Sequence, residues 1–193
     1  RKHRLAPAEL GAHRDRVAAE LEQLRGAGQR LDRLEGEIAA AAAHWSQAAS
    51  ALGATRQAAA SALDSAVSAL IAELGMGGGR FVAELEPIGP PRPDPNGGER
   101  VEFLVAANAG APPRALRKVA SGGELSRISL AIEVAALGSD AVPTMVFDEV
   151  DSGIGGAVAE IVGRKLRQLG RARQVLCVTH LPQVSAQGHA HYR

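Results

Sequence analysis

The first third of the chain repeats apolar side chains at intervals of seven. From Leu10 the interval selects nine such residues: Leu10, Val17, Leu24, Leu31, Ile38, Trp45, Leu52, Ala59 and Ala66. No proline lies between Ala8 and Leu74, so the pattern favours one long helix in a coiled coil. The alternative is two or three shorter helices broken at glycines. One helix cannot bury such a seam alone, so a second helix is needed, from elsewhere in the protein or from another chain.

A different pattern follows the glycine-rich segment GMGGG at residues 75–79. This segment follows a helix rather than a strand, so we interpret it as a helix C-cap and linker, not as a dinucleotide-binding loop. Residues 80–86 and 100–106 then alternate apolar and polar side chains, which predicts a pair of antiparallel strands. The stretch between them, PIGPPRPDPNGGE, has too many prolines for regular structure.

Beyond residue 111 the pattern becomes that of an α/β fold. It predicts a helix from about residue 122 to 136, a buried strand at 142–147, a helix from about 154 to 169 and a second buried strand at 174–179. A strand, a helix and a strand within about 35 residues indicate a right-handed βαβ unit with parallel strands.

Composition limits the possible classes of protein. Hydrophobic residues make up 46% but aromatic residues only 3%, and alanine supplies much of the apolar count, which suits a helix with a thin contact seam. A net charge of +1 argues neither for nor against nucleic acid. The single cysteine, Cys177, excludes an internal disulfide and is compatible with a reducing compartment. With no apolar run of membrane-spanning length and no signal peptide, we expect a cytoplasmic protein. The lack of an initiator Met suggests a piece of something longer.

Two carboxylates and a histidine follow the two apolar strands. AVPTMVFDE ends on Asp148 and Glu149, and QVLCVTH ends on His180. Ligands bind at the carboxyl edge of open α/β sheets, so all three side chains are expected there. One carboxylate can hold Mg²⁺ through water while the other addresses a nucleophilic water, and a histidine can donate a hydrogen bond to a phosphate. The alternatives are a solvent-exposed or capping acidic pair and a structural histidine.

The stretch VASGGELSR opens the predicted helix at residue 122. Ser121 and Glu124 match the capping-box pattern S-x-x-E, which explains both without a ligand. Gly122 and Gly123 each weaken a helix, yet at its first positions they leave bare N–H groups at the positive helix end, which favours an anion site. The lysine of a phosphate loop, G-x-x-x-x-G-K-[ST], occurs nowhere in the 193 residues.

Three motifs resemble those of ABC-type ATPases in order and spacing. SGGE resembles their signature, DE closing an apolar strand resembles Walker B, and TH closing the next strand resembles the switch histidine. More narrowly, KVASGGELSRISLAI, FDEVDSGIGG and CVTHLPQVSAQGHAHYR resemble the RecN family of bacterial SMC-like DNA repair ATPases, whereas SMC proteins proper usually continue DEVD with AALD. The resemblance covers about residues 118–193, and the coiled coil agrees in kind. Ala120 replaces the leucine that most often precedes the signature serine.

The resemblance implies a split ATPase head with a coiled-coil arm. Residues 5–74 would be the returning helix of the arm. Residues 75–193 would be the C-terminal lobe of the α/β head, with a parallel βαβ sheet and an antiparallel strand pair. The missing lysine would belong to Walker A in an N-terminal lobe of the same protein. The implied cofactors are ATP and Mg²⁺, and two heads would form a homodimer around ATP.

The resemblance also implies a role for each motif residue. Asp148 would organise Mg²⁺ through water, Glu149 would polarise the attacking water and His180 would sense the γ-phosphate. The signature would bind the γ-phosphate of ATP held by the partner head, through Ser121, Gly122, Gly123 and Glu124. A loop crossing the dimer interface, the D-loop, would be formed by Asp151, Ser152 and Gly153.

The function implied is that of an ATP-hydrolysing, SMC-like DNA repair protein. Its partner would be DNA, at broken or single-stranded ends. The protein would act in the cytoplasm of a bacterium, associated with the nucleoid, and would have no membrane partner. Without Walker A, the chain alone is expected not to hydrolyse ATP. The alternatives are a non-enzymatic coiled-coil tether whose globular end dimerises, or the head of another SMC-family ATPase.

Overall fold

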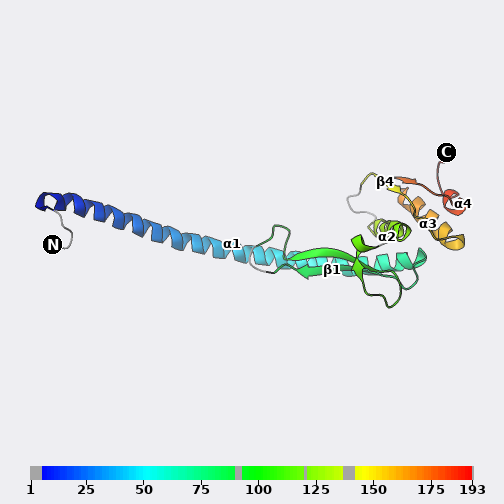
Figure 1. Cartoon of the computed structure of the whole chain (residues 1–193), viewed down its shortest axis with the longest axis horizontal. Helices are drawn as coiled ribbons and strands as arrows, with labels where there is room; N and C mark the ends of the chain where they lie inside the picture. Colours follow the sequence, from blue (N-terminus) through cyan, green and yellow to red (C-terminus); the bar gives the residue numbers. More distant parts are fainter. Residues whose placement is uncertain (1–5, 90–92, 120, 137–141, 193) are drawn as a thin grey trace.

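The computed structural model of the chain describes residues 6–89, 93–119, 121–136 and 142–192, so Ala120 lies outside the described residues. After the short 3-10 helix η1 (Pro7–Glu9), one helix, α1 (Leu10–Glu73), runs for 64 residues. It spans about 100 Å at 1.5 Å per residue. The N-terminal half of α1 extends away from the rest of the molecule, and the C-terminal half lies along it (Figure 1). The prediction of one uninterrupted helix is confirmed.

The seam of α1 differs from the predicted one in the half that meets the head. Apolar seam residues of the N-terminal half, such as Leu24 and Ile38, are exposed. In the C-terminal half the predicted Ala59 and Ala66 are exposed, and the following residues, Ala60 and Val67, are buried instead. The buried column is therefore shifted by one residue, because this part of α1 packs on a sheet and on α2 rather than on a second helix alone.

The end of α1 forms the predicted glycine C-cap. Gly75 has a φ of 86°, which suits a residue without a side chain, and the Met76 N–H donates to the carbonyl of Ile71 at 3.1 Å. The antiparallel strands β1 (Arg80–Pro87) and β2 (Glu99–Ala106) follow, as predicted. The short strand β3 (Arg114–Ala115), which we had not predicted, pairs with β2.

Side chains of α1 hold β1 along its length. Ser68 Oγ accepts the Phe81 N–H at 3.0 Å, and Asp64 Oδ1 accepts the Ala83 N–H at 2.6 Å. The proline-rich connection also returns to α1, since Trp45 Nε1 donates to the carbonyl of Asp94 at 2.8 Å. Between Pro87, the last residue of β1, and Glu99, the first residue of β2, the described residues contain no helix or strand, as the prolines predict.

The remaining elements form the predicted βαβ unit. After η2 (Leu116–Lys118) come α2 (Gly122–Ala135), β4 (Thr144–Phe147), α3 (Gly156–Leu169), β5 (Gln174–Cys177) and α4 (Pro182–Ser185). Strands β4 and β5 pair in parallel with Phe147 opposite Cys177, which confirms the prediction. Compared with the predicted bounds, β4 begins two residues later, α3 begins two residues later and β5 ends two residues earlier. The helix α4 was not predicted.

One prediction about this sheet is wrong: β4 and β5 are not buried on both faces. Phe147 and, in part, Met145, Val175 and Cys177 pack into the core, whereas Val146 and Leu176 are exposed. Alternate residues of a strand point to opposite faces, and no described element covers the second face of this pair.

A single hydrophobic core joins the elements of the head. It takes residues from α1, β1, α2 and α3, including Ile71, Phe81, Ile128 and Val162, together with Phe147 of β4. The last turns of α1 therefore take part in the same core as the βαβ unit, which fixes the direction of the arm relative to α2. Within the described ranges, no helix is both long enough and apolar enough to cross a membrane.

Candidate functional site

The loops after β4 and β5 lie side by side at the carboxyl edge of the parallel pair. Because Phe147 pairs with Cys177, the residues that follow each strand leave the sheet together. A cavity of about 270 Å³ opens between the two loops. It is lined by three carboxylates and by polar and apolar residues, namely Asp148, Glu149, Asp151, Ser152, Val178, Thr179 and His180. The structure thus brings together the acidic pair and the histidine that the sequence placed at one sheet edge.

Asp151 joins the two loops. The residue is only 2% exposed, and its Oδ2 accepts the hydroxyl of Thr179 and the N–H groups of His180 at 3.1 Å and Leu181 at 3.3 Å. The same oxygen lies 3.3 Å from His180 Nδ1. The residue predicted to cross a dimer interface is thus buried within its own chain, whereas its neighbours Ser152 and Gly153 are exposed.

These contacts keep Asp151 ionised. Burial by itself raises the pKa of a carboxyl group, but the hydrogen bonds from Thr179, His180 and Leu181 and the charge of His180 together outweigh it. The pKa of Asp151 is therefore lowered from its usual value. The anion serves as a common acceptor for three consecutive residues of the loop that carries His180, and so fixes the conformation of that loop.

The turn that opens α2 has one of the two hydrogen bonds of the predicted capping box, the one to the Ser121 hydroxyl. Ser121 has an extended backbone, and its Oγ accepts the Glu124 N–H at 3.3 Å. The first amide groups of a helix have no acceptor within the helix, so those of Gly122 and Gly123 stand at its positive end. Both the capping and the anion-site interpretations therefore remain compatible with this turn.

The two glycines of this turn lie against the loop after β4. A Cβ atom on Gly123 would lie 2.8 Å from Cβ of Ser152 and 3.1 Å from the carbonyl oxygen of Glu149, so only glycine fits there without movement. A Cβ atom on Gly122 would collide with the carboxylate of Glu149. Gly123 therefore has a packing role that the sequence did not reveal: it lets the turn at Ser121–Gly123, here called the signature turn, touch the loop after β4. At Gly122 the neighbour is only the end of the flexible Glu149 side chain.

Glu149 has an unusual backbone. Its φ is 57°, and among the described residues it is the one non-glycine residue with a positive φ. Such a conformation costs on the order of 1–3 kcal/mol for a residue with a side chain. It turns the carboxylate toward the N-terminal end of α2, where the helix dipole stabilises a negative charge.

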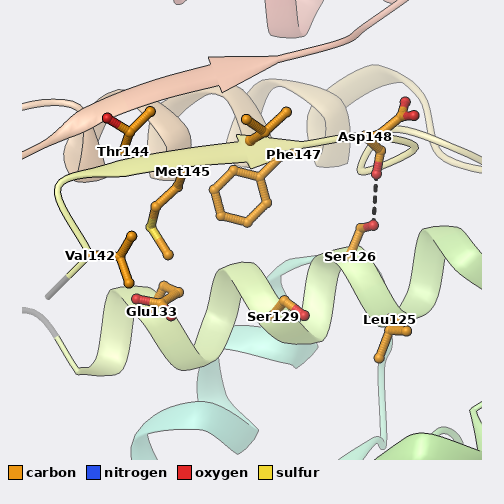
Figure 2. Close-up of a pocket in the computed structure, with 10 residues that line it drawn as sticks. Leu125, Ser126, Ser129, Glu133, Val142, Thr144, Met145, Phe147 and Asp148 are labelled. Carbon is orange, nitrogen blue, oxygen red and sulfur yellow. Dashed lines mark hydrogen bonds between the residues drawn. The ribbon is translucent and has the colours of Figure 1, made fainter.

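Asp148 lines the same cavity as Glu149 and also contacts α2. Its Oδ1 accepts the N–H of Glu149 at 2.8 Å, and its backbone carbonyl accepts the hydroxyl of Ser126 at 2.7 Å. Figure 2 shows this contact at one end of a second cavity, of about 360 Å³, between α2 and β4, with Met145 and Phe147 directed into it. The hydroxyl of Ser126 thus ties the second turn of α2 to the end of β4.

The residues present fit Mg²⁺ and ATP only in part. No group of three or more His, Cys, Asp or Glu side chains that could hold a metal ion occurs in the part of the chain that the structure describes. The exposed carboxylate of Asp148 fits a water-mediated contact, with the other ligands coming from outside the chain. The exposed turn at Ser121 and Gly122 fits a phosphate oxygen. The predicted roles of these residues stay predictions.

Sequence reasoning missed two residues of this site, Arg127 and Thr179. Arg127 of α2 donates from Nη1 to the carbonyl oxygen of Ser152 at 2.7 Å. The spacing held a clue to Arg127, because it lies four residues after Gly123 and thus on the same helix face. Thr179 belongs to the motif TH, but nothing in the sequence indicated its contact with Asp151, which lies 28 residues earlier.

Known proteins resemble the chain over its whole length. No model of a protein family matches it. It is 61% identical over 193 residues to the DNA repair protein RecN of Xylella fastidiosa strain Temecula1, covering 100% of this chain and 35% of that protein. It is 42% identical over 189 residues to the DNA repair protein RecN of Haemophilus influenzae, covering 98% of this chain and 34% of that protein. The chain therefore spans about a third of the length of these relatives.

A solved structure supports the fold. The Smc head domain with a coiled coil and joint from Pyrococcus yayanosii matches with a TM-score of 0.51 and 22% identity, covering 94% of this chain and 30% of that one. At this identity the match shows the fold alone: an SMC-type head with a coiled-coil arm. The family comes from the two relatives alone: the chain belongs to the family of the DNA repair protein RecN.

Proposed function

We propose that this chain is the C-terminal half of an ATP-hydrolysing head, and that it contributes to two different nucleotide sites. The observation that carries the proposal is the position of the loop Glu149–Gly153. On one side this loop is bound to the residues around His180 through Asp151, and on the other it touches the signature turn at Gly122 and Gly123. A coiled-coil tether has no need of a buried carboxylate that orders a histidine loop at a sheet edge.

Each part of the site has a distinct task in this proposal. Asp148 holds Mg²⁺ through water, Glu149 polarises the attacking water and His180 donates to the γ-phosphate. The turn at Ser121–Gly123 binds the γ-phosphate of ATP held by a second head. Ser152 and Gly153 are exposed beside that turn and face the second head. Bound ATP and Mg²⁺ supply the reacting phosphoryl group and the charge that neutralises it.

The position of Glu149 implies a movement. Its carboxylate lies against Gly122, on the helix end that is to receive a phosphate. Two anions repel each other there, so Glu149 must turn away from α2 when a phosphate of the opposite head arrives.

The same proposal extends to the whole protein. An N-terminal lobe with Walker A completes the head, two heads form a homodimer around ATP, and the arm transmits their opening and closing to DNA during repair of broken ends. The support is the RecN assignment and the SMC-type head fold. A DNA repair protein of a bacterium acts in the cytoplasm at the nucleoid, and we place this one there.

The test is ATPase activity after mixing this chain with the N-terminal portion of the same protein, with and without linear DNA. We expect activity only in the mixture, and none when the chain carries Glu149→Gln. In the intact protein, Glu149→Gln should accumulate ATP-bound dimers. Association of the two portions without turnover would instead support the tether, for which the exposed apolar seam of α1 is the favouring observation.

A further inference from the structure

Arg127 occupies a position in α2 where a charged side chain is unexpected. Its guanidinium faces the loop after β4, and the residue is only 6% exposed. Nη1 donates to the carbonyl oxygen of Ser152 at 2.7 Å and reaches that of Val150 at 3.5 Å. Both acceptors are backbone atoms, so Arg127 holds the course of the chain in this loop and not a particular side chain.

Arg127 and Gly123 form one contact surface with that loop. They are four residues apart, on the same face of α2. Gly123 brings the helix into contact with Ser152 and with the carbonyl of Glu149, and one turn later Arg127 binds the carbonyls of Val150 and Ser152. Two successive turns of α2 are therefore fastened to the segment that starts at Glu149.

A contribution to stability explains this arrangement poorly. Burial lowers the pKa of the Arg127 guanidinium, and this effect outweighs the negative charge of Glu124, which raises the pKa. Its Nε is buried and has no hydrogen-bond partner among the described residues. The cost of burying a guanidinium whose Nε is unpaired offsets part of what its hydrogen bonds to the backbone contribute. The position calls for a reason other than folding.

We propose that Arg127 is a positioning residue for hydrolysis. It fixes the segment Val150–Ser152 against α2. The direction of the Glu149 side chain therefore depends on the position of the signature turn, and so does the contact between Asp151 and the loop that carries His180. Through this link, the arrival of a phosphate at the signature turn of one nucleotide site adjusts the hydrolytic residues of the other. This inference rests on the proposed function, and Arg127 itself touches no substrate.

The test uses the intact protein with Arg127→Met, which keeps the length and packing of the side chain but has no donor. We expect kcat for ATP hydrolysis to fall about tenfold while KM changes less than about twofold, because ATP is held elsewhere. The melting temperature should change little, because relief from burying the guanidinium offsets the loss of its hydrogen bonds. Arg127→Lys keeps the charge but not the planar guanidinium, so its kcat should lie between that of Arg127→Met and that of the parent protein. Arg164→Met on α3, an exposed position, is the matched control and should leave kcat unchanged.

A second readout does not require catalysis. The Ser152 N–H donates to the carbonyl of Glu149 at 2.9 Å, and the Ile154 N–H to that of Asp151 at 3.4 Å. Hydrogen exchange of these two amides should accelerate in Arg127→Met and not in Arg164→Met. Unchanged kcat, or unchanged exchange, would overturn the inference. So would failure of both Arg127 variants to fold, because Arg127 would then be a stabilising residue. If Glu149→Gln still hydrolyses ATP, the proposed function fails instead, and exchange alone decides whether Arg127 orders the loop.

Discussion

Among single residues, Asp151 carries the most concentrated set of contacts in the site. One carboxylate oxygen serves three donors from Thr179, His180 and Leu181, in a position that is almost fully buried. Hydrogen bonds to a charged group contribute about 1.5–3 kcal/mol each, and leaving such donors unpaired costs a similar amount. The conformation of the loop that carries His180 therefore depends on the ionisation of one side chain.

Acid should remove this contribution. The pKa of Asp151 is lower in the folded chain than in the unfolded one, where it is about 3.9, so its charge stabilises the fold above that value. The contribution is lost as the pH falls through the folded-state pKa. At pH 7, Asp151→Asn should lower the free energy of unfolding by about 1–3 kcal/mol, and the difference from the parent chain should shrink below pH 4. Urea unfolding between pH 3 and 7 measures both.

The exposed pair Arg14 and Asp15 provides the control. Asp15→Asn should change the free energy of unfolding by less than about 0.5 kcal/mol at every pH, because exposed ion pairs contribute little. A difference between Asp151→Asn and the parent chain that stays constant from pH 3 to pH 7 would contradict the argument.

At the scale of single residues, the sequence could predict contacts between residues close together in the chain but not contacts between distant residues. The cap joins Ser121 to Glu124, three residues apart, and a short motif suffices to predict it. The partners of Asp151 lie 28 to 30 residues away, and their contact depends on how β4 and β5 pair. The burial of Arg127 depends on the loop that folds over it, and its polarity alone indicated a solvated position.

Among the elements, α1 consists of two halves in different environments. The N-terminal half exposes the apolar residues of its seam, and the C-terminal half packs against β1 and α2. Trp45 lies near the boundary, where its indole binds the backbone of the proline-rich connection. The period of seven predicted a long helix because the spacing persists over both halves. The one-residue shift of the buried column could not be predicted, since it depends on the sheet that α1 meets.

Loss of the indole donor should loosen the connection without disturbing the helix. Trp45→Phe keeps the aromatic packing but removes the hydrogen bond to the carbonyl of Asp94, which contributes about 1 kcal/mol. We expect a decrease of that size in the free energy of unfolding, unchanged helicity by circular dichroism and faster proteolysis within residues 93–98. Leu24→Ala on the same helix, at a position that is 70% exposed, should leave proteolysis of this segment unchanged. Equal cleavage rates for all three chains would contradict the proposed contact.

For the whole molecule, the arm and the head each leave an apolar surface open. The arm exposes the apolar side chains of its seam over its N-terminal half, and the head exposes Val146 and Leu176 on the outer face of β4 and β5. The apolar runs around these strands predicted full burial, because a strand covered on both faces lacks polar alternation. The apolar sequence of the two strands and their one-sided burial are consistent if a further part of the protein covers the exposed face of β4 and β5. Exposed apolar patches of this kind mark interaction surfaces.

A charge on this face should therefore act on association and not on folding. Val146 is 67% exposed on β4, opposite Leu176 of β5, so Val146→Lys should change the free energy of unfolding of the chain by less than about 0.5 kcal/mol. If the N-terminal portion of the protein covers this face, the lysine would be buried without a partner. Affinity for that portion should then fall at least about tenfold, since burying an unpaired charge costs several kcal/mol. Calorimetric titration against Val101→Lys, on the exposed side of β2, gives the matched comparison, because both changes add one charge to an exposed strand valine. Equal affinities for the two variants would place the partner lobe elsewhere on the head.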